Sequence, residues 1–348
     1  MKKVLSLILL VILTVCFSSC SSNEKEVICL FTWEGYVPLD IIEKFTKETG
    51  IEVNYTNFST NEEMYAKLKA VNAGEYDVVL ASDYIFETMA RDGGLMTEID
   101  KTKISNWSNI SKSYLNKNFD PGNKYTVPYA TGSTLIAYNP KTSPVKVTGY
   151  KDLLNPKLKG QIVSIDEMRV VIGMMNLMLG NSLNETDEQK LADAKDALNK
   201  LMPNVLTFNS DKPHEVLLSG EATVGLMYSS QVSAAIAENS DIEVVYPVEG
   251  IGIGIDSFCI PFNAPNKEGA YKFIDFLNRP EINAAIMPQI QYGTTNAAAV
   301  DLLDDEFKNN KAINIPEEYT LNSEIICDVG DVNNVYSDIW TQAKMSTQ

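Results

Sequence analysis

Apolar and polar positions alternate with two different periods along the chain from residue 27 onward. The first half predicts strands at 27–31, 51–55 and 76–80, and helices at 38–48, from Asn61 to Gly74, and from about 84 to Gly93. Leu39, Ile42 and Phe45 share one face of the first helix, and Asn61 is expected to cap the second. This βαβαβα order predicts an α/β fold with a mostly parallel sheet.

A second α/β run begins after residue 138. It predicts a short helix and turn at 150–156, strands at 161–165, 222–228, 242–246 and 255–260, and helices at about 168–179 and 187–201. The sequence holds no internal repeat and no low-complexity tract. Two successive α/β runs of this length predict two lobes, each with its own core.

The first 19 residues have the pattern of an export signal, so the predicted fold does not include them. Lys2 and Lys3 precede an apolar run at 4–15 that is too short to span a bilayer comfortably. The ending before Cys20 resembles a bacterial lipobox, which implies cleavage before Cys20, a lipid on its thiol, and a tether over 20–26. Cys16 is the alternative cleavage site. We therefore expect a protein of the cell envelope, lipid-anchored and facing the periplasm or the cell exterior.

The charge of the chain is strongly acidic, with 46 acidic and 29 basic residues and a formal net charge of −17. Removal of residues 1–19 takes away Lys2 and Lys3 only, so the net charge becomes −19. Such a surface disfavours nucleic acid and favours cationic partners.

Two loops rich in aromatic and acidic residues follow predicted strands. Trp33, Glu34 and Tyr36 come after the strand at 27–31, and Ser82, Asp83 and Tyr84 after the strand at 76–80. Ligands of open α/β sheets bind at the carboxyl ends of the strands, so both loops fall at that edge. Aromatic faces and carboxylates together suit an organic cation. The alternative is that the aromatics belong to the core and the acids are solvated loop charges.

Residues for catalysis or metal binding are scarce. His214 is the only histidine, no G-x-S-x-G motif is present, and no cysteine–histidine pair is indicated. A glycosidase pair of Glu34 and Glu167 is a conceivable but weaker reading. Capture of ferric ion is the nearer alternative, although Tyr228 is followed by serine and no metal constellation is evident. We predict no enzyme activity, no cofactor and no bound metal.

The cysteines of the mature chain beyond Cys20 are Cys29, Cys259 and Cys327. Their spacing fits no zinc pattern. A disulfide between Cys259 and Cys327 remains open.

Several strings resemble the spermidine/putrescine-binding proteins of bacterial polyamine ABC importers. These strings are TWEGYV (32–37), FTKETGI (45–51), NEEMYAKLK (61–69), YDVV (76–79), NFDPGN (118–123), LMPNV (201–205), FNSDKP (208–213), KEGAYKFIDFLNRP (267–280) and CDVG (327–330). The resemblance runs from about residue 27 to the C-terminus. It implies a two-lobed periplasmic-binding-protein fold, in which each lobe is a mostly parallel sheet flanked by helices and the ligand cleft lies between the lobes.

The resemblance also implies where the lobes and hinges lie. Lobe one would hold 27–132 and 256–301, and lobe two 133–255 and 302–348. The crossings near Ser133 and Gly254 are then candidate hinges. A membrane permease and its ATPase are the implied partners, and the binding protein is expected to be a monomer.

The ligand set that the resemblance implies combines aromatic and acidic residues from both lobes. It comprises Trp33, Glu34, Tyr36, Ser82, Tyr84, Glu167, Tyr228, Asp256 and Tyr292, to which Asp83 adds an acid not usual at its position. The carboxylates would accept hydrogen bonds from ammonium groups, and the rings would enclose the methylene chain.

Three positions depart from the family pattern. Val170 replaces an acid, Gly254 replaces a tryptophan beside Asp256, and Ile326 replaces a glutamine. Each change removes a contact that a longer polyamine would use. The sequence therefore favours putrescine or another short diamine over spermidine.

Overall fold

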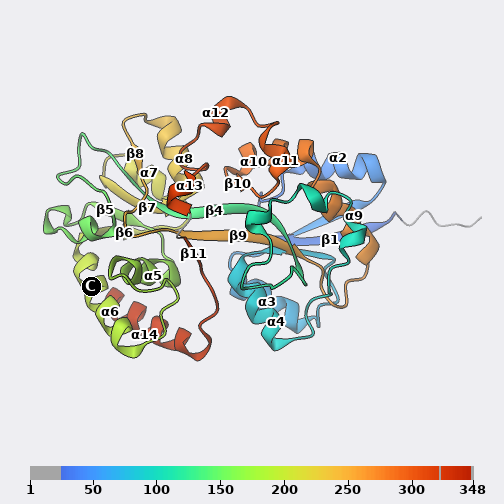
Figure 1. Cartoon of the computed structure of the whole chain (residues 1–348), viewed down its shortest axis with the longest axis horizontal. Coiled ribbons are helices and arrows are strands. Elements are labelled where there is room, and N and C mark those ends of the chain that lie inside the picture. The colour runs from blue at the N-terminus through green and yellow to red at the C-terminus, as the bar shows by residue number, and fades with distance from the viewer. Residues whose placement is uncertain (1–24, 321–322, 346–348) are drawn as a thin grey trace, which may run out of the picture.

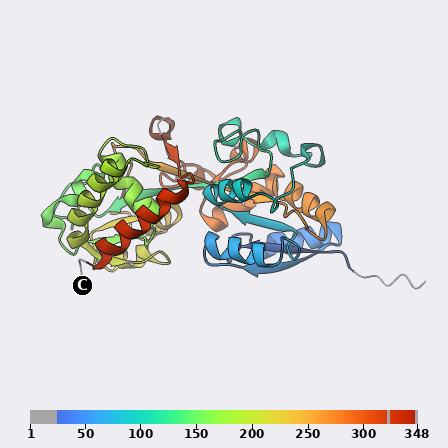
Figure 2. The ribbon, with the colours of Figure 1, turned by 90° about the horizontal axis from the view of Figure 1, so that it is seen from below.

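The protein consists of two α/β lobes joined by long strands, as the computed structural model shows for residues 25–320 and 323–345 (Figure 1). Seen from below, the lobes are separate bodies connected by a narrow neck of strands (Figure 2). Cys20, the expected lipid site, lies outside the described residues. Within those residues no helix is long and apolar enough to cross a membrane.

The first lobe is built on the three parallel strands that the sequence predicts. Its elements are β1 (Val27–Thr32), α2 (Leu39–Thr49), β2 (Glu52–Asn57), α3 (Asn61–Ala70), β3 (Val78–Ala81) and α4 (Asp83–Asp92). β1 lies between β2 and β3. Gly50 ends α2 in the left-handed region, with φ of 75°, where glycine is favoured. The expected cap at Asn61 is wrong by one residue, because the Thr60 side chain accepts the Glu63 N–H and Asn61 is the first helical residue.

The second lobe repeats a parallel arrangement, with β5 between β6 and β7. Its elements are β5 (Ile162–Ser164), α5 (Met168–Met178), α6 (Glu188–Leu201), β6 (Val205–Phe208), α7 (Pro213–Leu218), β7 (Val224–Tyr228), α8 (Ser229–Glu238), β8 (Glu243–Val245) and α14 (Asn333–Met345).

Two long strands, β4 (Thr126–Tyr138) and β9 (Gly252–Cys259), cross between the lobes and pair antiparallel. The order β2-β1-β3-β9-β4-β7-β5-β6 makes one mixed sheet. Three short strands join it: β8 and β10 (Gly293–Thr294) on β4, and β11 (Glu324–Ile325) on β9. Gly132 pairs with Gly254, and the Ser133 Oγ donates to the Gly252 carbonyl at 2.6 Å. We propose this paired segment as the hinge.

Helices cover both faces of the first lobe's sheet (Figure 1). α3 and α4 lie on one face. On the other, α2 packs with α9 (Lys267–Leu277) and α10 (Pro280–Ile290), where Phe45 contacts Phe273 and Phe276. The remaining short helices are α11 (Ala297–Val300), α12 (Asp305–Lys308) and α13 (Glu317–Thr320).

The core of the first lobe extends further along the chain than the expected limit at 301. Leu303, Phe307 and Ile313 pack in the same apolar cluster as Phe45. α14 instead packs in the second lobe, through Tyr336 and Trp340 among others. We therefore propose lobe one as 27–132 with 256–313, and place the return to lobe two after 313.

Cys29, Cys259 and Cys327 are free thiols. Cys259 is fully buried on β9, while Cys327 lies beyond β11 and its Sγ contacts the Ile325 carbonyl. The disulfide left open between Cys259 and Cys327 is not formed in this structure.

Candidate functional site

The loop after β1 is held in place by hydrogen bonds to its backbone. Gly35 adopts φ of 72°, which permits a tight turn, and the Tyr36 N–H donates to the Trp33 carbonyl at 3.3 Å. Tyr55 on β2 supports the turn, because its hydroxyl donates to the Trp33 carbonyl and accepts from the Tyr36 N–H. Trp33 is half-buried and Glu34 is exposed. The loop thus presents an indole and a carboxylate beside a fixed phenol.

Tyr36 and Asp256 form the central contact of the site. The Tyr36 hydroxyl donates to the Asp256 Oδ2 at 2.5 Å, which joins the loop after β1 to the crossing strand β9. The Tyr36 carbonyl accepts from the Tyr129 hydroxyl at 2.8 Å. Burial raises the pKa of Asp256 to about 6, although hydrogen bonds from Tyr36 and Ser82 act in the opposite sense. A cation beside this carboxylate would therefore replace lost solvation.

Asp83 lies at the start of α4 and is turned into the protein. Only 3% of its surface is exposed, and its carboxylate accepts from the Ile255 N–H at 2.9 Å and the Tyr84 N–H at 2.8 Å. The sequence places Asp83 among the ligand-binding residues, whereas its oxygens here bind backbone. Burial raises its pKa to about 8. We propose that Asp83 ties α4 to β9 behind Asp256.

Substitution Asp83→Asn tests this role through stability. A folded pKa near 8 exceeds the unfolded value near 3.9, so the contribution to stability is complete below about pH 4 and is lost as the pH rises through 8. Asparagine does not ionise. Between pH 5 and pH 8, urea unfolding of the ligand-free proteins should show the free energy of unfolding of the wild type falling by roughly 3 to 4 kcal/mol relative to that of the variant. A constant difference at both pH values would contradict a buried, titrating Asp83.

Tyr84 and Ser82 are positioned by the first residue of α3. The Asn61 amide donates to the Tyr84 hydroxyl at 3.1 Å and accepts from the Ser82 N–H at 3.3 Å. Asn61 was expected only as a helix cap, and its site contacts were missed.

Aromatic rings line the site as a connected series. Trp33 meets Tyr36 edge to face at 5.3 Å between ring centroids, and Tyr36 meets Tyr292 in the same way at 5.4 Å. Tyr292 lies over Gly132, where an added Cβ would come within 2.7 Å of the ring. Gly132 is therefore required for this ring position.

Tyr228 and Glu167 enter from the second lobe. Tyr228 ends β7; its pKa is raised by burial and then by the charges of Glu167, Tyr292, Tyr84 and Asp256. Residues of both lobes thus converge on one region.

Glu167 precedes α5 and remains accessible to water. Partial desolvation and the nearby Glu62 and Asp166 raise its pKa to about 7. The carboxylates of Asp256 and Glu167 both favour a cationic ligand.

The three departures from the family pattern present no polar side chain. Val170 and Ile326 pack against the apolar core of the second lobe. Gly254 faces open space, because an added Cβ there would meet only the Gly132 carbonyl at 4.0 Å.

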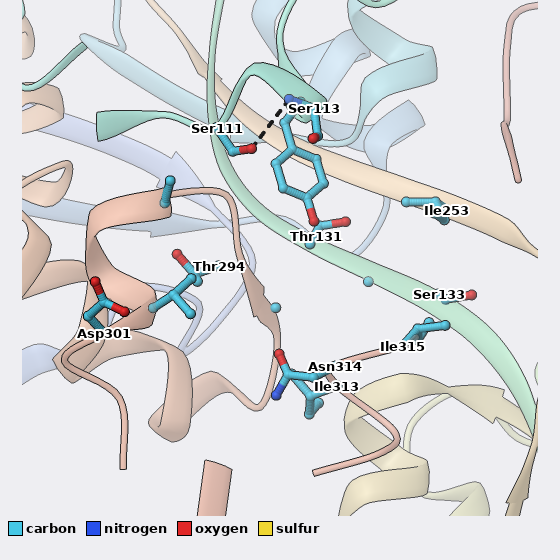
Figure 3. A pocket seen from close by; sticks show the side chains of 15 residues that line it. Ser111, Ser113, Thr131, Ser133, Ile253, Thr294, Asp301, Ile313, Asn314 and Ile315 are labelled. Atoms are coloured by element: carbon cyan, nitrogen blue, oxygen red, sulfur yellow. Dashed lines mark hydrogen bonds between the residues drawn. The ribbon is translucent and has the colours of Figure 1, made fainter. Parts of the chain in front are cut away.

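A separate pocket of about 440 Å³ lies beside the crossing strands (Figure 3). Thr131, Ser133 and Ile253 line it together with Asp301 and Asn314. Because side chains alternate along a strand, Thr131, Ser133 and Ile253 point away from the face that carries Asp256. None of the predicted ligand residues lines this pocket. Within residues 25–320 and 323–345, no group of three or more His, Cys, Asp or Glu residues could hold a metal ion.

Comparison with known proteins identifies the family. The sequence model described as "Bacterial extracellular solute-binding protein" matches residues 40–315. The chain belongs to this family. Among related solute-binding proteins, the spermidine/putrescine-binding periplasmic protein of Escherichia coli (strain K12) is 39% identical over 94% of both chains.

Two further solute-binding proteins support the assignment. The putrescine/cadaverine-binding protein of Pseudomonas aeruginosa is 30% identical, with coverage of 97% of this chain and 99% of its own. The solved spermidine/putrescine ABC transporter substrate-binding protein of Streptococcus pneumoniae superposes with a TM-score of 0.84 at 31% identity. That superposition covers 93% of the present chain and all of the Streptococcus pneumoniae chain. The expected two-lobed α/β fold and the resemblance to polyamine-binding proteins are confirmed. These relatives lend no support to the ferric alternative.

Proposed function

We propose that this chain captures polyamines outside the cytoplasm for an ABC importer. The observation that carries the proposal is the Tyr36–Asp256 contact at the edge of an aromatic series that Glu167 and Tyr228 approach from the other lobe. Within the described residues neither Asp256 nor Glu167 takes part in an ion pair. Two uncompensated carboxylates among rings match the two charged ends and apolar middle of a diamine.

The energetics favour such a ligand over an anion or a neutral solute. An ammonium over an aromatic face gains about 0.5 to 2 kcal/mol. A carboxylate about 4 Å from it adds roughly 4 kcal/mol at an effective dielectric constant near 20. Removal of water from both groups offsets part of this gain. Ligand affinity then depends on closure of the two lobes, which excludes water from the contacts.

Calorimetry with residues 21–348 tests the proposed function. Putrescine, cadaverine, spermidine and ferric citrate would be titrated separately into the protein. We expect micromolar or tighter binding of putrescine, about −8 kcal/mol. Absence of heat with every amine, together with binding of iron, would overturn the proposal and restore the ferric alternative.

The proposed ligand preference is for a short diamine. Val170, Gly254 and Ile326 supply no group for the extra amine of spermidine. Val170→Glu should therefore raise the affinity for spermidine relative to putrescine by about tenfold, because one charge-assisted hydrogen bond is worth about 1.5 kcal/mol or more. Val170→Gln is the matched neutral control. An equal gain in both variants, or none, would contradict a role for charge at this position.

The proposal extends to location and partners. The signal segment and Cys20 support a lipid-anchored monomer at the cell envelope that delivers its ligand to a membrane permease and its ATPase. We propose no catalytic role, since His214 lies on α7 and none of the proposed ligand contacts involves it.

A further inference from the structure

The start of α3 brings a second carboxylate to Tyr84. Asn61 is 8% exposed and fixes both Ser82 and Tyr84 through its amide, so the position of residue 62 relative to Tyr84 is determined by the helix. The Tyr84 hydroxyl donates to the Glu62 Oε1 at 2.9 Å. Glu62 is itself exposed, so its carboxylate can accept further hydrogen bonds.

The neighbouring Glu63 differs from Glu62 in its partners. Glu63 accepts from the Ser59 N–H at 2.8 Å and pairs with Lys67 at 2.6 Å, one helical turn away. Glu62 has no ion pair within the part of the chain that the structure describes. Two adjacent glutamates of α3 therefore have different environments: one is neutralised on the helix surface, and the other lies uncompensated beside a site tyrosine.

Glu62 also acts electrostatically on Glu167, a carboxylate of the opposite lobe. Its charge raises the pKa of Glu167 more than does that of Asp166, the residue adjacent to Glu167 in sequence. Asp166 has its own partner in Lys344, at 2.7 Å. Glu62 at the start of α3 and Glu167 just before α5 thus repel each other. A cation between them would convert that repulsion into two attractive contacts.

We propose that Glu62 is a further ligand-binding residue, which shares with Glu167 the ammonium group at the end of the polyamine remote from Asp256. An ammonium has three N–H donors, enough for both carboxylates at once. This inference rests on the proposed function, since it assigns one end of the same ligand. It also gives α3 a role in specificity: a ligand with a single amine bound at Asp256 cannot use Glu62.

Glu62→Gln tests the inference, because glutamine keeps an acceptor for Tyr84 and removes only the charge. Calorimetry on residues 21–348 should show putrescine binding weakened by about 5- to 20-fold. Glu63→Gln, the matched control, should change it by less than about twofold. Competition with 1-butylamine measures the monoamine, whose affinity Glu62→Gln should leave unchanged within about twofold.

Two results would overturn the inference while leaving the proposed function intact. One is putrescine binding to Glu62→Gln as tightly as to the wild type. The other is an equal loss for 1-butylamine and putrescine, which would indicate a general field effect or a disturbed site. Absence of any amine binding by the wild type is distinguishable from both, and it would remove the proposed function and this inference together.

Discussion

Asp256→Asn is expected to weaken putrescine binding by at least about 2 kcal/mol, or roughly 30-fold. The carboxylate lies on β9 and accepts from the Tyr36 hydroxyl, so it is fixed before any ligand arrives. Asparagine retains a carbonyl acceptor for Tyr36 but leaves the ligand ammonium without its counter-charge. Isothermal titration calorimetry of both proteins at pH 8 measures the difference.

The control for Asp256→Asn is Asp193→Asn on α6. Asp193 is exposed and contacts Gln189 of the same helix, so its loss removes one unit of negative charge without touching the site. We expect less than about a twofold change in affinity. Comparable losses in both variants would mean that net charge, and not the Asp256 contact, determines the affinity.

Acidification should weaken polyamine binding steeply between pH 8 and pH 5.5. In the ligand-free protein, burial raises the pKa of Asp256 to about 6, and partial desolvation with the nearby Glu62 and Asp166 raises that of Glu167 to about 7. The amines of the ligand, like that of lysine, stay protonated over this range. Below each carboxyl pKa the ligand must displace a proton, so affinity falls with pH by up to tenfold per unit for each group. The two groups together give a loss of roughly 100-fold.

Calorimetry in buffers of different ionisation enthalpy checks this pH dependence in two ways. The dissociation constant should rise as the pH falls, and protons should be released on binding near pH 6. Glu167→Gln should remove most of the dependence between pH 8 and pH 6.5. An affinity that is constant from pH 8 to pH 5.5 would show that neither carboxylate titrates in contact with the ligand.

Local patterns predict the elements of this fold better than their pairing. The alternation of short apolar runs and amphipathic helices is sufficient to place β1, β2 and β3 and the helices between them. The antiparallel pairing of β4 with β9 is not encoded locally, because their partners Gly132 and Gly254 lie 122 positions apart. The predicted parallel pairing therefore holds for β2-β1-β3 and for β6-β5-β7, and the crossing strands, which pair antiparallel with β3 and β7, make the sheet mixed.

The candidate site shows the same division between local pattern and tertiary contact. Trp33, Tyr36, Ser82 and Tyr84 follow strands whose carboxyl ends meet at one edge, and that rule is visible in sequence. The direction of a single side chain is not visible in sequence. Asp83 lies in the same polar loop as Ser82 and Tyr84, yet its carboxylate accepts from the Ile255 N–H.

Glu62 and Asn61 illustrate contacts that sequence alone did not reveal. The string 61–69 predicts only a helix and its cap, and the packing of α3 against α4 is what brings Asn61 and Glu62 to Tyr84. Tyr55 and Tyr129 support Tyr36 in the same indirect way. Tyr55 is half-buried and Tyr129 is buried, and no local pattern indicates which carbonyl or amide each hydroxyl contacts.

A crystal structure of residues 21–348 with putrescine would show whether the diamine binds between Asp256 and Glu167. We expect one amine within hydrogen-bonding distance of Asp256 and the other beside Glu167, with the methylene chain enclosed by Trp33, Tyr228 and Tyr292. Density for the diamine elsewhere, such as in the pocket behind the crossing strands or on the outer surface, with Asp256 bound only by Tyr36 and Ser82, would contradict it.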